Sequence, residues 1–292
     1  MQVDRQSSPP QPGSELAPAQ ALFWTIAQRY RTGAAHSAFA LDIEGPLDGD
    51  ALCRALDAIV AHHVTLRTAF TSRGGNVQGR PVEGVWPEIQ RIDVDRTALA
   101  RLLIEEPQRP FDLAKPPLVR FTVARLDDAH HVLVAVFHHI ATDGTSMWRL
   151  FPAELAELYR SARAGAPLVL PPTPQRYADF AIRSRAENEG PGAQAMIDFW
   201  RTELADRPPI LELPTDRVRP HRPAGVGAHA ERVLSKSVRD RVHQIAPELG
   251  VRPVDVLLAA WAVLLHRASG MTDILIGTPH ANRTPETGGV HG

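Results

Sequence analysis

Four residues near the middle of the chain have types and a spacing that could do chemistry: His138, His139, Asp143 and Gly144. They follow an apolar, β-branched run, residues 132–137, which predicts a strand that is buried on both faces. Polar titratable groups at the end of a buried strand cost free energy unless they are hydrogen-bonded. Their presence therefore points to a functional site.

Successive side chains of a strand point to opposite faces, so His138 and His139 are expected to have different surroundings. This disfavours a two-histidine, one-carboxylate metal site, because its ligands must converge. It favours general base chemistry, in which packing holds one imidazole and the other meets substrate near neutral pH. Asp143 would then orient a histidine or pair with an arginine, and Gly144 would let a ligand approach the backbone. A structural interpretation stays open, in which Asp143 caps the next helix and Gly144 is a turn residue.

Hydrophobic periodicity predicts the elements that position these residues. Strands are expected at 39–43, 65–71, 118–126, 132–137 and 273–277, and helices at about 18–30, 50–60, 147–158, 177–181, 197–204 and 251–268. The strands at 118–126 and 132–137 are separated by a short turn, which predicts a β-hairpin. The order indicates a mixed α/β fold of α+β type, without the strict alternation of a doubly wound sheet.

Composition shifts predict the domain organisation. Residues 1–16 are rich in Pro, Gln and Ser and are expected to form a flexible leader. A Pro-rich stretch at 163–174 is the best candidate for a linker between two lobes. We therefore expect an N-terminal lobe over 17–165 and, over 166–292, a crossover followed by a second lobe.

Charge and cysteine content exclude several function classes. The 32 basic and 33 acidic residues give a net charge of −1, so no overall field favours nucleic acid or an anionic membrane. Cys53 is the only cysteine, which rules out an intrachain disulfide and a cysteine-based metal cluster. The sequence shows neither a signal peptide nor an apolar run of membrane-spanning length, and we expect a cytoplasmic protein.

The heptapeptide that begins at His138 has the form HHxxxDG and resembles the signature of condensation domains in nonribosomal peptide synthetases. These belong to a superfamily of chloramphenicol acetyltransferase-like acyltransferases. Further stretches resemble family motifs in the family's order, namely 16–24, 62–70, 177–180 and 276–283. The chain departs from the pattern at Ala21, where arginine is usual, and in the first half of 62–70.

The resemblance implies a two-lobe fold with the active site in a tunnel between the lobes. Carrier proteins deliver thioesters on 4'-phosphopantetheine, and an amine acceptor takes the acyl group to form an amide. No metal and no directly bound cofactor are expected. The resemblance assigns His139 to the attacking amine, Asp143 to an ion pair with Arg283, Gly144 to the thioester carbonyl and His138 to structural support.

Other expectations concern the scaffold and the alternatives. Arg67, in the second motif, is expected to be a buried hydrogen-bonding scaffold residue. Family members continue well past 276–283, so the first lobe is expected to be complete and the second partial, with exposed apolar surface on 251–268 that favours self-association or a complementing chain. The alternatives are an ester-forming acyltransferase of the same fold and a non-catalytic carrier-docking module.

Overall fold

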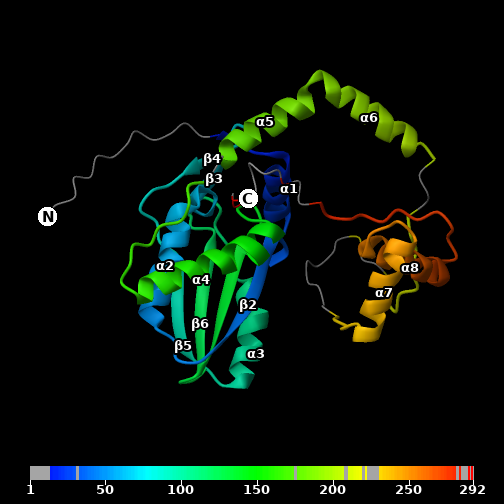
Figure 1. Cartoon of the computed structure of the whole chain (residues 1–292). Coiled ribbons are helices and arrows are strands. Elements are labelled where there is room, and N and C mark those ends of the chain that lie inside the picture. Colours follow the sequence, from blue (N-terminus) through cyan, green and yellow to red (C-terminus); the bar gives the residue numbers. More distant parts are fainter. Residues whose placement is uncertain are drawn as a thin grey trace. The chain divides into compact units, whose positions relative to one another are not determined.

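The structure is a computed structural model, and it describes residues 14–30, 33–173, 176–206, 210–218, 221, 230–280, 283, 289 and 291. The chain divides into two compact units (Figure 1). The first comprises Met1–Gly190 with Ala281–Gly292, and the second comprises Pro191–His280. The predicted lobe boundary at residue 165 stays a prediction.

A four-stranded sheet forms the centre of the first unit, in the order β2-β7-β6-β5. Its strands are β2 (His36–Glu44), β5 (Glu88–Asp93), β6 (Val119–Asp127) and β7 (His130–His138). Strands β6 and β7 form the predicted antiparallel hairpin, β2 pairs antiparallel with β7, and β5 pairs parallel with β6. Because β7 has neighbours on both sides, its end is held by two strands.

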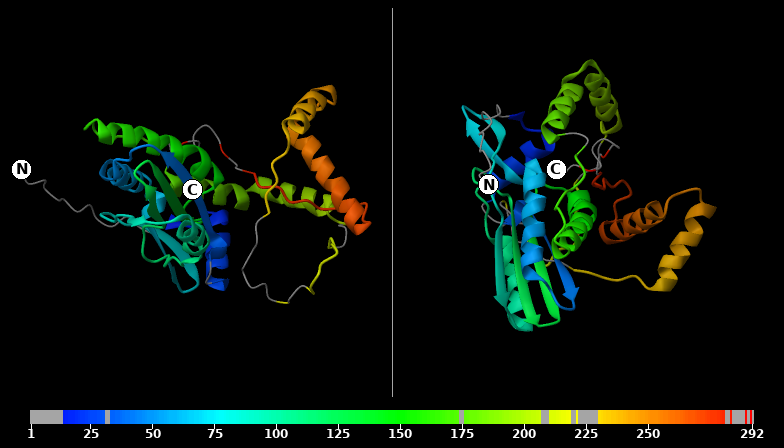
Figure 2. Two further views of the ribbon diagram at one scale, coloured as in Figure 1. Left: turned by 90° about the horizontal axis from the view of Figure 1, so that it is seen from below. Right: turned by 60° about the vertical axis from the view of Figure 1, so that its left-hand side comes forward.

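Helices cover both faces of this sheet. Helices α2 (Gly49–His62) and α4 (Phe151–Arg163) pack on one face, and Figure 2 shows them on the same side of the sheet. Their apolar side chains join Phe121 and Phe137 of the sheet in the main core. Side chains of α3 (Arg96–Glu105) pack with the opposite face. Strand β7 is therefore buried on both faces, as its apolar sequence predicted.

Local capping explains where the helices begin. Helix α2 begins after Asp48, whose side chain accepts a hydrogen bond from the Ala51 amide at 2.9 Å, and α1 (Pro18–Arg29) has a proline in its first turn. A smaller sheet has the order β1-β4-β3, with β1 (Ser14–Glu15), β3 (Thr68–Arg73) and β4 (Asn76–Pro81). Helix α5 (Tyr177–Glu189) lies against β1 and α1, and Arg185 donates to the Leu16 carbonyl at 3.1 Å.

The strand predicted at 65–71 is wrong in its first half. Residues Val64–Arg67 form a 3-10 turn, η2, and β3 begins only at Thr68. The turn is closed by local hydrogen bonds, from the Leu66 amide to the His63 carbonyl at 3.1 Å and from the Thr68 hydroxyl to the Val64 carbonyl at 2.7 Å. Such local bonds satisfy the backbone without a neighbouring strand, which the alternation of side chains does not reveal.

The second unit contains α6 (Pro191–Glu203), α7 (Lys236–Glu248) and α8 (Pro253–Ser269). Helices α7 and α8 pack on each other, and α8 ends at Gly270, whose φ of 74° lies in the left-handed region that glycine favours. Apolar side chains of α8, Trp261 and Leu264 among them, are exposed in this unit, as predicted. The self-association inferred from them stays a prediction.

The strand predicted at 273–277 is wrong. The segment is irregular, and none of the described strands pairs with it. A strand is stabilised by hydrogen bonds to a neighbour, so an apolar β-branched sequence alone is insufficient. No single described helix is long and apolar enough to cross a membrane; α7 and α8 pass that test only together, with a bend of 107° between them.

Candidate active site

Strand β7 delivers the two histidines to the edge of the first unit's core and ends between them. His138 is the last residue of the strand, and its amide donates to the Leu118 carbonyl at 2.9 Å. The chain then turns at His139, whose amide donates to the Ala35 carbonyl at 2.8 Å. Both backbone positions are therefore fixed by segments remote in sequence.

His138 is enclosed. Its side chain is among the largest that are fully buried. The centroid of its ring lies 5.4 Å from that of His36 and 6.1 Å from that of Phe111. Its Nδ1 accepts a hydrogen bond from the Ile140 amide at 3.1 Å. Burial, helped by the neighbouring His36 and His139, lowers the pKa of His138 to about 3. The ring is thus neutral at physiological pH, and it stabilises the turn through its burial and its hydrogen bond to the Ile140 amide.

His139 is only partly buried and has other neighbours. Its ring is stacked on Phe23 of α1, with centroids 4.2 Å apart and planes 9° from parallel. Its Nδ1 is buried and has no hydrogen-bond partner among the described residues. The two histidines have separate surroundings, as the alternation of strand side chains predicted.

Gln20 of α1 holds the turn from the other side. The side chain is buried, its Nε2 donates to the Ile140 carbonyl at 3.2 Å, and its Oε1 accepts from the Ala17 amide at 3.2 Å. Neither Gln20 nor Phe23 was predicted as a site residue. Both residues lie in the first motif-like stretch, 16–24, so the sequence did mark this helix. A local pattern does not show which residue a helix contacts 120 positions further along the chain.

Asp143 forms the predicted ion pair with Arg283. The Arg283 guanidinium donates from Nη2 to Oδ1 at 2.7 Å and from Nε to Oδ2 at 3.2 Å, and the two side chains are 15% and 24% exposed, respectively. Asp143 also caps the next helical segment, because its Oδ1 accepts from the Ser146 amide at 2.8 Å and the Ser146 hydroxyl at 2.7 Å. The arginine pair and the helix cap, which the sequence left open as alternatives, are therefore both present in one geometry.

Further side chains surround this pair. Arg283 also donates to the Ser146 hydroxyl at 3.0 Å. Burial raises the pKa of Tyr177 to about 12, with the nearby Arg283 and Asp143 acting in opposite directions, so its phenol is protonated beside the ion pair. Asp143, Tyr177 and Arg283, one residue from each of three motif-like stretches, thus meet at one place.

Gly144 follows Asp143 at an exposed position, and apart from its chain neighbours and its own helix backbone no atom of the described residues lies within 4 Å of where a Cβ would be. Its backbone does not require glycine, because its φ is not in the left-handed region. The segment Ser146–Leu150 that follows is a π-helix, η4, which leads into α4; such insertions occur frequently at functional sites.

Arg67 lies elsewhere. Its guanidinium donates to the Ala61 carbonyl at 3.2 Å and to Glu83 at 2.6 Å, and its side chain is 12% exposed. These contacts tie the end of α2 to the segment after β4. This fits the scaffold role expected from the sequence. None of these contacts joins Arg67 to His138 or His139.

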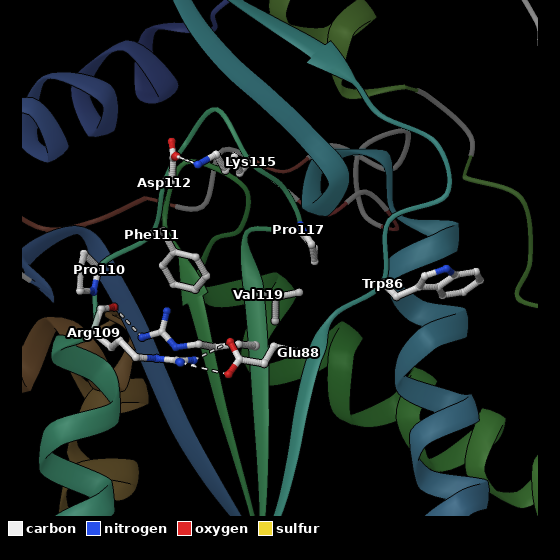
Figure 3. Close-up of a pocket in the computed structure, with 10 residues that line it drawn as sticks. Trp86, Glu88, Arg109, Pro110, Phe111, Asp112, Lys115, Pro117 and Val119 are labelled. Carbon is white, nitrogen blue, oxygen red and sulfur yellow. Dashed lines mark hydrogen bonds and ion pairs between the residues drawn. The ribbon is translucent and has the colours of Figure 1, made fainter.

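A cavity of about 320 Å³ lies beside Phe111 (Figure 3). Phe111, which packs on His138, lines it, and the Arg120 guanidinium lies 4.2 Å from the centroid of that ring. The remaining lining residues are Trp86, Glu88, Arg109, Pro110, Asp112, Lys115, Pro117 and Val119. His139 is not among them. This cavity is therefore separate from the predicted site.

A family model for the condensation domain matches residues 12–291. The chain belongs to the condensation domain family. The phosphinothricin tripeptide synthetase PhsB of Streptomyces viridochromogenes is 38% identical over 270 residues, which cover 87% of this chain and 22% of the synthetase. This chain thus spans about a fifth of the length of that curated relative.

Two solved structures give the fold. The X-domain in complex with OxyB, from teicoplanin biosynthesis, has a TM-score of 0.81 and 28% identity, covering 100% of this chain and 66% of the X-domain chain. The first condensation domain of the CDA synthetase has a TM-score of 0.75 and 24% identity, covering 92% and 64%. The predicted mixed α/β fold of condensation domains, of chloramphenicol acetyltransferase type, is confirmed.

Proposed function

We propose that this condensation domain is an acyltransferase that forms an amide bond between a carrier-bound acyl or aminoacyl thioester and an amine acceptor. The observation that supports this most is the fixed HHxxxDG turn, in which His139 is stacked on Phe23 and Asp143 is paired with Arg283. Membership of the family and similarity to a tripeptide synthetase support it further.

In this proposal the acceptor amine attacks the thioester carbonyl, so that a C–N bond forms and the C–S bond breaks. The attacking nitrogen loses a proton to His139, and His139 passes that proton on to the thiolate that leaves. Because Nδ1 of His139 is buried, Nε2 is the nitrogen that would receive the proton. Aligning amine and carbonyl supplies much of the rate, since holding two reactants in place removes the entropy cost of their encounter.

The other predicted residues act through His139 or beside it. Gly144 leaves room for the thioester, and Asp143 with Arg283 fixes the loop that carries the histidine. His138 and Arg67 support the scaffold. The proposed partners are carrier proteins that present the acyl group on 4'-phosphopantetheine, together with a small amine or aminoacyl acceptor. A cytoplasmic location stays a prediction.

The test uses the full-length gene product that carries this domain, carrier proteins loaded with a panel of acyl and aminoacyl thioesters, and amine acceptors. Amide product identified by mass spectrometry, lost in His139→Ala and retained in the control His130→Ala, supports the proposal. His130 is a suitable control because it is a partly exposed strand residue paired with Asp42. Product only with alcohol acceptors would favour the ester-forming alternative.

A docking role is the second candidate, and one comparison favours it. The similar X-domain was solved as a complex with OxyB, so a protein of this fold assembles with another protein. Carrier binding without product, equally strong in the parent and in His139→Ala, would support docking and overturn the catalytic proposal.

A further inference from the structure

A second group of histidines lies apart from His139, around Glu154 of α4. His63 caps the end of α2, and His291 lies near the end of the chain. The Nε2 atom of His63 is 2.7 Å from the Glu154 Oε2 atom, and that of His291 is 3.7 Å from the same oxygen. The two rings are 4.0 Å apart. One ligand atom from each residue lies within 4.8 Å of the others.

The three side chains are held in place and enclosed. The side chain of His63 is 2% exposed, that of Glu154 17% and that of His291 0%. The Thr65 hydroxyl donates to the His291 carbonyl at 3.0 Å, which fixes the backbone of that residue. The cluster is therefore a built feature of the first unit's interior.

Hydrogen bonding does not account for His291. Neither of its ring nitrogens has a hydrogen-bond partner among the described residues, although the ring is fully buried. A buried polar nitrogen without a partner costs free energy, and proteins rarely keep one without a reason.

Two imidazole nitrogens and one carboxylate oxygen form a donor set that suits Zn²⁺. A tetrahedral site with bonds of about 2.0 to 2.1 Å separates its ligand atoms by roughly 3.3 Å. The contacts of 2.7 Å and 3.7 Å to the Glu154 oxygen lie on either side of that spacing. All three ligand atoms lie within 4.8 Å of one another, so side-chain movements that close this separation to the tetrahedral spacing would bring them onto one ion.

We propose that His63, Glu154 and His291 bind Zn²⁺ as a structural site. The ion takes the place of the hydrogen atom between Nε2 of His63 and Oε2 of Glu154, and the neutral imidazole then carries that hydrogen on Nδ1. Binding ties the segment that carries His291 to α4. The site takes no part in acyl transfer, so it does not depend on the proposed function.

The test is a zinc titration of the full chain after treatment with a chelator, in competition with a chromophoric zinc indicator. We expect one Zn²⁺ per chain and a higher midpoint of thermal unfolding with zinc. His63→Ala and His291→Ala should each weaken binding by more than tenfold, since loss of even an outer hydrogen-bond partner of a metal ligand typically costs about 10- to 100-fold. His130→Ala, which removes the histidine of another histidine–carboxylate pair, should bind zinc like the parent.

A conservative variant guards against misfolding. His291→Cys keeps a metal ligand, so it should retain zinc binding, and with Co²⁺ it should gain a thiolate-to-cobalt charge-transfer band that the parent lacks. The proposal is overturned if the parent binds no zinc, if binding survives in both alanine variants, or if the cysteine variant folds and shows no such band.

Discussion

Breaking the Asp143–Arg283 pair should uncouple the loop of His139 from the rest of the first unit. Arg283→Ala removes a two-point ion pair between side chains that are 15% and 24% exposed. Hydrogen bonds to charged groups contribute about 1.5 to 3 kcal/mol, and solvent screening places this partly exposed pair near the lower end. Asp143→Ala should cost about 1 kcal/mol more, because it also removes the helix cap at Ser146.

A double-mutant cycle isolates the pair. We expect the free energies of unfolding in urea of the parent, both single variants and the double variant to give a coupling of about 1 to 2 kcal/mol. The matched control is a cycle of Asp143→Ala with Arg67→Ala. Arg67 is also an arginine paired with a carboxylate, but its contacts lie at Ala61 and Glu83, so its coupling to Asp143 should be under about 0.5 kcal/mol.

The same variants should transfer acyl groups more slowly under conditions in which they are still folded. A misplacement of about 1 Å costs on the order of 100-fold in rate, so Arg283→Ala at a temperature where it stays folded should show at least such a loss. A coupling no larger than that of the Arg67 control, or full activity in Arg283→Ala, would refute the idea that this pair positions His139.

Three further predictions concern the neighbours of the pair. In the unfolded chain His138 takes up a proton below its ordinary pKa of 6.5, whereas in the folded chain it does so only near pH 3. As the pH drops from 6.5 to 3, His138 should therefore lower the free energy of unfolding by about 1.4 kcal/mol per pH unit, and the fall should be less steep in His138→Asn. Equal slopes in urea melts of the parent and the variant would contradict this. Phe23→Ala should reduce kcat about 3- to 10-fold by removing a stacked contact, with Phe23→Tyr as the active control; an unchanged kcat would argue against it. Gly144→Val should keep the urea midpoint and lose on the order of 100-fold in kcat/KM, whereas full activity would make Gly144 a turn residue only.

Local patterns predicted the elements well, because they depend on neighbours in sequence. The run that ends at Phe137 predicted the buried strand, and the periodicity over 50–60 predicted α2. The separate surroundings of His138 and His139 followed from strand alternation alone. The pairing of Asp143 with Arg283 came only from the family resemblance, since 140 residues separate the two.

What the sequence did not reveal depends on contacts between distant segments. Gln20 reaches the Ile140 carbonyl across 120 residues, and nothing in its own helix indicates this. The segment 273–277 has the composition of a strand, but strand formation needs a partner, which periodicity does not report. The cluster of His63 with His291 likewise joins residues 228 positions apart in sequence, and only the fold brings them together.

The most direct test of the proposed function is single-turnover acyl transfer by the full-length gene product, with a loaded carrier as donor and an amine as acceptor. The geometry around His139 predicts amide formation by the parent and a rate about 10²- to 10⁴-fold lower in His139→Ala, the range that a general base contributes. Equal rates for the parent and a folded His139→Ala would contradict the central claim.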